Sequence, residues 1–316
     1  MAKLTLEKTS MRDVFGEVIL ELAKSDPKVY ALDGDLANST KINTVAEQFP
    51  EKFLQMGIAE QNMMGVAAGM ASAGLQPWIA TFAAFLTKRS LDQISVVVAQ
   101  PKMDVKMIGA YSGLLNGCAG KTHQAVEDVA IMRSLPNMAV IAPGDTGELK
   151  QAMQFANRYK GPVYIRVARD PVARALPEEY TFMFGKAVKL REGSDVAIIT
   201  SGTQTGRSLC AAAELEKEGI SAIVLHVPTI KPLDVDAIIA VAKQTGAVVT
   251  AEEHSIIGGL GGAVAETLAE HYPVPVLRVG VEDINIQSGS NEALLDRYGL
   301  SSRHVVRKVK EILRKK

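Results

Sequence analysis

The chain has 316 residues, and its 35 basic and 35 acidic side chains cancel to a formal net charge of zero at pH 7. Its composition, 47% hydrophobic and 22% charged, is typical of a globular protein long enough for two domains and excludes extensive disorder. The balanced charge gives no indication of a nucleic-acid or membrane partner, and the first residues lack the apolar core of a signal peptide, so we expect a cytoplasmic protein. The two cysteines, Cys118 and Cys210, lie far apart and have no metal-ligand spacing, which predicts no metal site.

Short apolar runs alternate with helical patterns through the first half of the chain. The clearest helix begins at Met11, carries apolar residues at spacings of three and four, and ends near Asp26-Pro27. The predicted strands of this half are 29–33, 78–82, 105–110, 139–142 and 163–167. Such alternation favours parallel sheets covered by helices on both faces.

A polar, proline-bearing stretch over residues 170–186 predicts a linker, and we place a domain boundary at residue 176. A second α/β set follows it. The expected strands are 196–201, 222–227, 247–251 and 274–279, and the expected helices are 205–218, 235–244 and 262–270. The predicted fold class is therefore two consecutive α/β domains with mostly parallel sheets.

The segment Gly57-Ile58-Ala59-Glu60-Gln61-Asn62-Met63-Met64 carries one carboxylate among apolar neighbours, and Thr81-Phe82-Ala83-Ala84-Phe85 follows about twenty residues later. A Glu at the start of a helix, here 59–73, is usually a surface residue that complements the helix dipole. A carboxylate beside two aromatics is also what a protein needs to hold and protonate an aromatic nitrogen heterocycle.

These segments, together with Thr122-His123-Gln124-Ala125-Val126-Glu127-Asp128 and Glu252-Glu253-His254 with its glycine run, resemble the transketolase family. More narrowly, they resemble the C-terminal subunit of a split transketolase over nearly the whole chain. The resemblance implies a pyrimidine-binding domain over residues 1–176, a transketolase C-terminal domain over 177–316, and thiamine diphosphate as cofactor.

The resemblance also implies roles for the motif residues. Glu60 would hydrogen-bond the pyrimidine nitrogen of the cofactor and drive it to its imino tautomer, while Phe82 and Phe85 would pack on the pyrimidine ring. Asp35 and Leu36 would line the same end of the cofactor. Many relatives place a third aromatic where this chain has Lys88.

The implied substrate site includes His123, which would contact the donor sugar. Three residues, Arg12, Ser39 and Arg169, match positions that hold the terminal phosphate of the sugar, and two guanidiniums with a hydroxyl suit an anion. Arg166, three residues before Arg169, is an alternative.

The run from Tyr111 to Gly120 departs from the family pattern. Tyr111, Cys118 and Ala119 stand where relatives carry a His and a Glu-Asp pair, of which the His and Asp read sugar hydroxyls. We therefore expect an unusual donor that keeps a terminal anion.

The metal motif of thiamine-dependent enzymes is absent, because Gly34-Asp35 is followed by Leu36. The resemblance implies that Mg²⁺ or Ca²⁺ is held by a separate N-terminal subunit that carries the diphosphate-binding domain, in an α2β2 assembly. The glycine run 258–262 precedes a helix and resembles a phosphate cradle, but a glycine run alone is weak evidence, and we assign it a structural role.

The leading interpretation is half of an enzyme that transfers a two-carbon ketol unit from an anionic ketose, such as a sugar phosphate, to an aldose. Two alternatives remain: the β subunit of a 2-oxo acid dehydrogenase or a deoxyxylulose phosphate synthase relative, and a noncatalytic assembly subunit. The motifs around Glu60 and His123 favour the transketolase branch, and the intact Phe82 and Phe85 count against a noncatalytic role.

Overall fold

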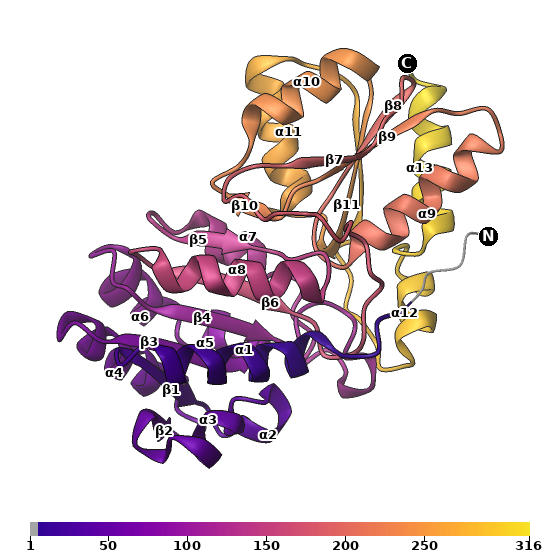
Figure 1. Cartoon of the computed structure of the whole chain (residues 1–316). Helices are drawn as coiled ribbons and strands as arrows, with labels where there is room; N and C mark the ends of the chain where they lie inside the picture. Colours follow the sequence, from indigo (N-terminus) through magenta and orange to yellow (C-terminus); the bar gives the residue numbers. More distant parts are fainter. Residues whose placement is uncertain (1–5) are drawn as a thin grey trace.

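Two sheets organise the chain, described here for residues 6–316 from a computed structural model (Figure 1). The first sheet has seven strands, and every pairing in it is parallel except that of the edge strand β10. Its strands in spatial order are β10 (Thr229–Lys231), β5 (Ala139–Ile141), β6 (Val163–Val167), β4 (Lys106–Ala110), β3 (Gln76–Phe82), β1 (Val29–Asp33) and β2 (Phe53–Gln55).

The second sheet has five strands and is parallel apart from its edge strand β7. Its order is β12 (Val276–Val281), β11 (Val248–Ser255), β8 (Val196–Thr200), β9 (Ala222–His226) and β7 (Val188–Arg191). The predicted fold class, two α/β domains with mostly parallel sheets, is confirmed.

Helices surround both sheets (Figure 1). In the first half they are α1 (Met11–Ser25), α2 (Ala37–Thr40), α3 (Asn43–Gln48), α4 (Glu60–Ser72), α5 (Ala83–Arg89), α6 (Leu91–Gln93), α7 (Asp128–Ser134) and α8 (Thr146–Arg158). In the second half they are α9 (Gln204–Glu216), α10 (Val235–Thr245), α11 (Leu260–His271), α12 (Asn291–Arg297) and α13 (Ser302–Leu313). Short turns of 3-10 helix occupy Pro50–Lys52 and Gly117–Ala119, and a π-helical segment occupies Ile94–Ala99.

The inner strands β1, β3, β4 and β6 of the first sheet are buried on both faces, which explains their continuous apolar runs. Trp78 packs into a core with Phe15 of α1, while its neighbour Ile79 packs into the opposite core with Met63 of α4. Successive side chains of a strand point to opposite faces, so each strand supplies both cores. Ser10 precedes helix α1, and its hydroxyl caps the helix by accepting from the Asp13 amide.

The predicted strands agree with the observed ones to within a few residues, while the short strands β2, β7 and β10 escaped prediction. Strand β10 lies in the second half of the sequence and yet completes the first sheet, pairing antiparallel with β5. The boundary at residue 176 stays a prediction; it falls between the end of β6 at Val167 and the start of β7 at Val188.

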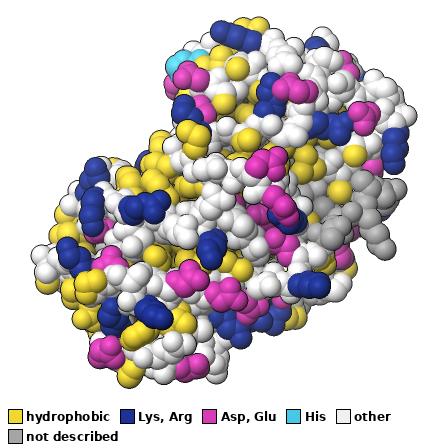
Figure 2. Space-filling model, viewed as in Figure 1, with side chains coloured by type: hydrophobic (Ala, Val, Ile, Leu, Met, Phe, Trp, Pro, Cys, Tyr) yellow, Lys and Arg dark blue, Asp and Glu magenta, His cyan; other side chains and the backbone are white. Residues whose placement is uncertain are grey.

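Charged side chains of both signs are interspersed over the face of the molecule in Figure 2. Within residues 6–316, no helix is both long enough and apolar enough to cross a membrane.

Candidate active site

A cavity of about 410 Å³ opens where β1 and β3 end and α4 begins. Side chains and backbone from four separate segments line it: Gly34, Asp35, Leu36, Ile58, Glu60, Phe82, Phe85, Arg89, Thr122 and His123. The carboxyl ends of parallel strands are the usual place for ligand sites in α/β sheets. All five residues predicted to contact the cofactor, together with His123, therefore lie around one cavity.

One wall of the cavity is aromatic. The Phe82 and Phe85 ring centroids lie 5.7 Å apart, and the His123 imidazole stands edge-on to the Phe85 ring at 5.1 Å. The Thr122 hydroxyl lies 2.8 Å from His123 Nδ1, a contact that restrains the imidazole. Together these rings present a flat apolar surface with a polar edge, suited to a heteroaromatic ligand.

Glu60 is the first residue of α4 and is only 3% exposed, so the interpretation as a surface residue is wrong. Its Oε1 accepts a hydrogen bond from Arg89 Nη1 at 2.9 Å. The Arg89 guanidinium also lies over the Phe85 ring, 4.1 Å from its centroid. Arg89 thus contacts both the carboxylate and the aromatic wall, a role that the sequence analysis missed.

Lys88, which stands where a third aromatic was expected from the family pattern, is not among the residues that line the cavity. Its ammonium pairs with Glu127 at 2.7 Å, and both side chains are about 40% exposed. A pair this exposed contributes little to stability. On this side the aromatic wall is completed by the edge of His123 and the plane of Arg89.

The loop after β1 is held by a buried carboxylate, Asp33. Its two oxygens accept from the Leu36 amide at 3.1 and 3.0 Å, and one of them also accepts from Gln55 Nε2 at 2.7 Å. Burial raises the pKa of Asp33, against the opposing effect of these hydrogen bonds. Asp35 adopts a left-handed backbone with φ of 67°, which Asp tolerates better than most residues. The loop that presents Asp35 and Leu36 is thereby fixed.

Beside the cavity, the three residues predicted for the terminal anion, Arg12, Ser39 and Arg169, come together around Tyr111. Arg12 Nη1 donates to the Tyr111 hydroxyl at 2.8 Å and to the Ser39 carbonyl at 3.3 Å. The guanidiniums of Arg12 and Arg169 lie 5.9 and 5.6 Å from the Tyr111 centroid. Tyr111 also stacks on Phe82 at 4.1 Å, so this cluster adjoins the cavity directly.

The sequence left Arg166 as an alternative to Arg169 for binding the terminal anion, but Arg166 has another role. It is buried, and its guanidinium forms a two-point ion pair with Asp128, with Nε and Nη2 at 2.8 and 3.0 Å from the carboxylate oxygens. The same carboxylate accepts from the Tyr164 hydroxyl at 2.7 Å. Arg166 is therefore part of the core, whereas Arg169 has a side chain 33% exposed and can reach a ligand.

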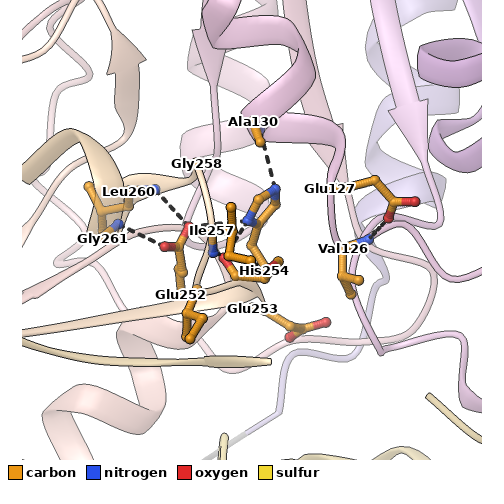
Figure 3. Close-up of polar contacts among 12 residues, drawn as sticks. Val126, Glu127, Ala130, Glu252, Glu253, His254, Ile257, Gly258, Leu260 and Gly261 are labelled. Atoms are coloured by element: carbon orange, nitrogen blue, oxygen red, sulfur yellow. Dashed lines mark hydrogen bonds and ion pairs between the residues drawn. The ribbon is translucent and has the colours of Figure 1, made fainter. Parts of the chain in front are cut away.

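The motif Glu252-Glu253-His254 lies near the end of β11 at the junction of the two domains, and Figure 3 shows contacts of Glu252 and His254. Glu252 accepts from the Leu260 and Gly261 amides, each at 2.7 Å, at the start of α11. His254 Nε2 accepts from the Ala130 amide at 3.3 Å, across the domain junction. The amides that would form a phosphate cradle are occupied by a protein carboxylate, which agrees with the structural role assigned to the glycine run.

Within the described part of the chain, no three His, Cys, Asp or Glu side chains are grouped to hold a metal ion.

Comparison with known protein families matches residues 7–173 to the transketolase pyrimidine-binding domain and residues 185–305 to the transketolase C-terminal domain. The 6-deoxy-6-sulfo-D-fructose transketolase subunit SqwH of Clostridium sp. (strain MSTE9) is 42% identical over 99% of this chain and 98% of its own length. A subunit of the apulose-4-phosphate transketolase of Phocaeicola vulgatus is 35% identical over 96% of this chain and 97% of its own. A solved split-gene transketolase, described as an inactive β4 tetramer, superposes with a TM-score of 0.88 at 44% identity, over 98% of this chain and 99% of that one.

Proposed function

The chain belongs to the transketolase family, as a counterpart of the subunits of its split members, and from this we propose that it forms the pyrimidine-binding half of a two-subunit ketol transferase. The complete enzyme would move a two-carbon ketol unit from an anionic ketose to an aldose in the cytoplasm. The observation that carries the proposal is Glu60, a carboxylate 3% exposed at the edge of an aromatic-walled cavity.

The residues around the cavity fit the pyrimidine end of thiamine diphosphate. Phe82 and Phe85 offer a flat apolar face, and the cavity of about 410 Å³ has room for a ring. Among residues 6–316, Arg89 donates to Oε1 of Glu60 and no protein group donates to Oε2. One carboxylate oxygen is therefore available to a ligand, and Asp35 and Leu36 line the same cavity.

Each residue then has a task. Glu60 holds and moves a proton at the pyrimidine nitrogen, and the two phenylalanines orient the ring and exclude water from that contact. His123, at the cavity edge, exchanges a proton with a hydroxyl of the sugar. Arg12 and Arg169 bind the terminal anion, with Ser39 beside them. The cofactor, when bound, supplies the electron sink that the protein itself lacks.

The diphosphate end of the cofactor and its Mg²⁺ or Ca²⁺ belong in this proposal to a separate N-terminal subunit, in an α2β2 assembly. Two facts support a partner: the chain carries the two family domains described above, and the similar split-gene structure that holds β subunits alone is described as inactive.

The anionic donor is supported by the Arg12 and Arg169 guanidiniums, which lie 5.9 and 5.6 Å from the centroid of the Tyr111 ring. Two relatives are named for sugars that carry an anionic group, 6-deoxy-6-sulfo-D-fructose and apulose 4-phosphate, which fits the donor expected from the departure at Tyr111. We therefore include sulfonated and branched ketoses among the candidate donors.

Co-expression with a candidate diphosphate-domain subunit tests the proposal. The purified complex, supplied with thiamine diphosphate and Mg²⁺, should consume at least one ketose from a panel of phosphorylated, sulfonated and branched donors when an aldose acceptor is present. A stable complex that binds the cofactor and yet transfers no ketol unit from any of them would favour the noncatalytic alternative.

A further inference from the structure

The segment Ser112–Gly120 joins two residues of the site, because Tyr111 precedes it and His123 follows shortly after it. We call it the substrate loop. It leaves β4 at Tyr111, whose backbone is left-handed with φ of 60°, and it contains the short turn Gly117–Ala119. A non-glycine residue in this conformation is sparsely populated and persists only where the surroundings hold it. The contacts that hold the loop therefore influence both site residues.

The C-terminal domain supplies side-chain contacts to the loop at two points, beside a backbone hydrogen bond from the Gly289 amide to the Gly117 carbonyl at 3.1 Å. Glu253 of β11 is 3% exposed, and its Oε1 accepts from the Leu114 and Leu115 amides at 2.7 and 3.1 Å. Its other oxygen accepts from the Thr203 hydroxyl at 2.7 Å. Gly113 has φ of 75°, and a Cβ there would lie 2.3 Å from Glu253 Oε1. The loop backbone thus lies directly against this carboxylate.

The second point is Asn291, the first residue of α12. Its Oδ1 accepts from the Gly117 amide at 2.9 Å, and its Nδ2 donates to Asp170 Oδ2 at 2.6 Å. The other oxygen of Asp170 accepts from Arg169 Nη1 at 2.7 Å. One amide side chain therefore joins the substrate loop to the carboxylate that orients Arg169.

From these contacts we infer that Asn291 and Glu253 are positioning residues for substrate recognition: the C-terminal domain sets the substrate loop and aims Arg169 at the anion of the donor. The C-terminal domain would thus have more than a passive role, and the part of this inference that concerns the substrate rests on the proposed function. Neither residue faces the cavity beside Glu60, so the positioning acts on the sugar and leaves the chemistry at the pyrimidine unchanged.

Hydrogen–deuterium exchange on the isolated chain tests the positioning without any activity. Asn291→Ala and Glu253→Ala should each speed exchange of the amides in Ser112–Gly120, since the variants remove the acceptors of Gly117 or of Leu114 and Leu115. Glu253→Gln keeps an acceptor oxygen and should restore the slow exchange. Asn157→Ala, which removes a similarly half-buried amide on α8, is the matched control and should leave the loop unchanged.

Kinetics on the assembled enzyme test the substrate half, with the best anionic donor of the panel and the corresponding neutral ketose. Asn291→Ala should raise KM for the anionic donor by roughly 3- to 10-fold, the effect of one or two lost hydrogen bonds, with kcat and the exchange at the thiazolium carbon unchanged. Asn291→Asp keeps an acceptor for Gly117 but places a second carboxylate near Arg169, so it should lower the preference for the anionic donor while loop exchange stays slow.

Each outcome of these two experiments decides a different part of the inference. Unchanged loop exchange in both alanine variants overturns the positioning. Faster loop exchange with an unchanged KM overturns the link to substrate. If the wild-type assembly transfers no ketol unit at all, the proposed function fails, while the exchange experiment still decides whether the C-terminal domain holds the loop.

Discussion

Replacing Glu60 by Gln is the sharpest test of the site. The side chain keeps its shape and can still accept a hydrogen bond from Arg89 at Oε1, which lies 2.9 Å from Nη1. An amide cannot take and return a proton at a ring nitrogen as a carboxyl group does. We therefore expect proton exchange at the thiazolium carbon of bound thiamine diphosphate to slow by about 10² to 10⁴, the usual contribution of a positioned acid or base.

The cost to folding should be small by comparison. Arg89 is 47% exposed, so the ion pair lost with the carboxylate is screened on one side and is worth about 1 kcal/mol or less. The free energy of unfolding of Glu60→Gln should thus lie within about 1 kcal/mol of the wild-type value. A large difference between the kinetic and the stability effects is what a catalytic role requires.

Proton NMR of the assembled enzyme after rapid mixing with deuterated buffer measures the exchange, and urea titration of the chain measures the stability. Glu266→Gln is the matched control, because Glu266 also pairs with an arginine, Arg133, but on α11 away from the cavity. An exchange rate in Glu60→Gln within threefold of the control would refute the assignment and leave Glu60 a buried helix-start residue.

Three further predictions follow from the same structure. The purified chain with thiamine diphosphate and Mg²⁺ should show no ketol transfer in a coupled spectrophotometric assay, because the diphosphate end of the site is assigned to the partner; robust turnover would contradict the split-site proposal. Arg169→Ala should lower kcat/KM for anionic donors at least tenfold, because charge-assisted hydrogen bonds are strong; an unchanged kcat/KM would refute the anion-binding role of Arg169. Xylulose 5-phosphate should not be the best donor in the panel, and its ranking first would refute the expectation of an unusual donor. Burial lowers the pKa of Lys106 from 10.5 to about 8, so the folded chain binds fewer protons than the unfolded chain between these values and stability should rise with pH there. Between pH 7.5 and 9.5, the free energy of unfolding measured with urea should rise by about 2 kcal/mol more in the wild type than in Lys106→Met. An equal rise in the two proteins would contradict the lowered pKa of Lys106.

The sequence was sufficient for features that depend on nearby residues. Trp78 and Ile79 lie in a run that is apolar on both faces, which predicts a central strand, and the motif around Glu60 indicated a heterocycle site before any geometry was known. The role of Arg89 beside Glu60 was not predicted, although the sequence contained a signal for it. Arg89 lies four residues after Phe85 on α5, a spacing that places the two side chains on one helix face.

Other features left no local trace. Asn291 contacts Asp170 across 121 positions, and strand β10 joins the first sheet from the far half of the chain. Such contacts depend on how two finished domains pack, and neither spacing nor periodicity encodes that packing. Arg166 and Arg169 illustrate the same limit, because only the position of Asp128 decides which guanidinium is buried.

The two domains differ in the anion-binding groups that they leave available to a ligand. The helix start most like a phosphate site, at Leu260 and Gly261, already has its amides bound to Glu252, and a second anion there would meet a buried carboxylate. Arg12 and Arg169 are instead placed beside Tyr111, next to the aromatic wall of the cavity. Under the proposed function, a negatively charged sugar would therefore bind at the pyrimidine-binding half, and the C-terminal half would act through Glu253 and Asn291 on the substrate loop. Donor specificity within this framework can be changed from either side of the domain junction, because Arg169 and the residue that supports its carboxylate partner come from different domains.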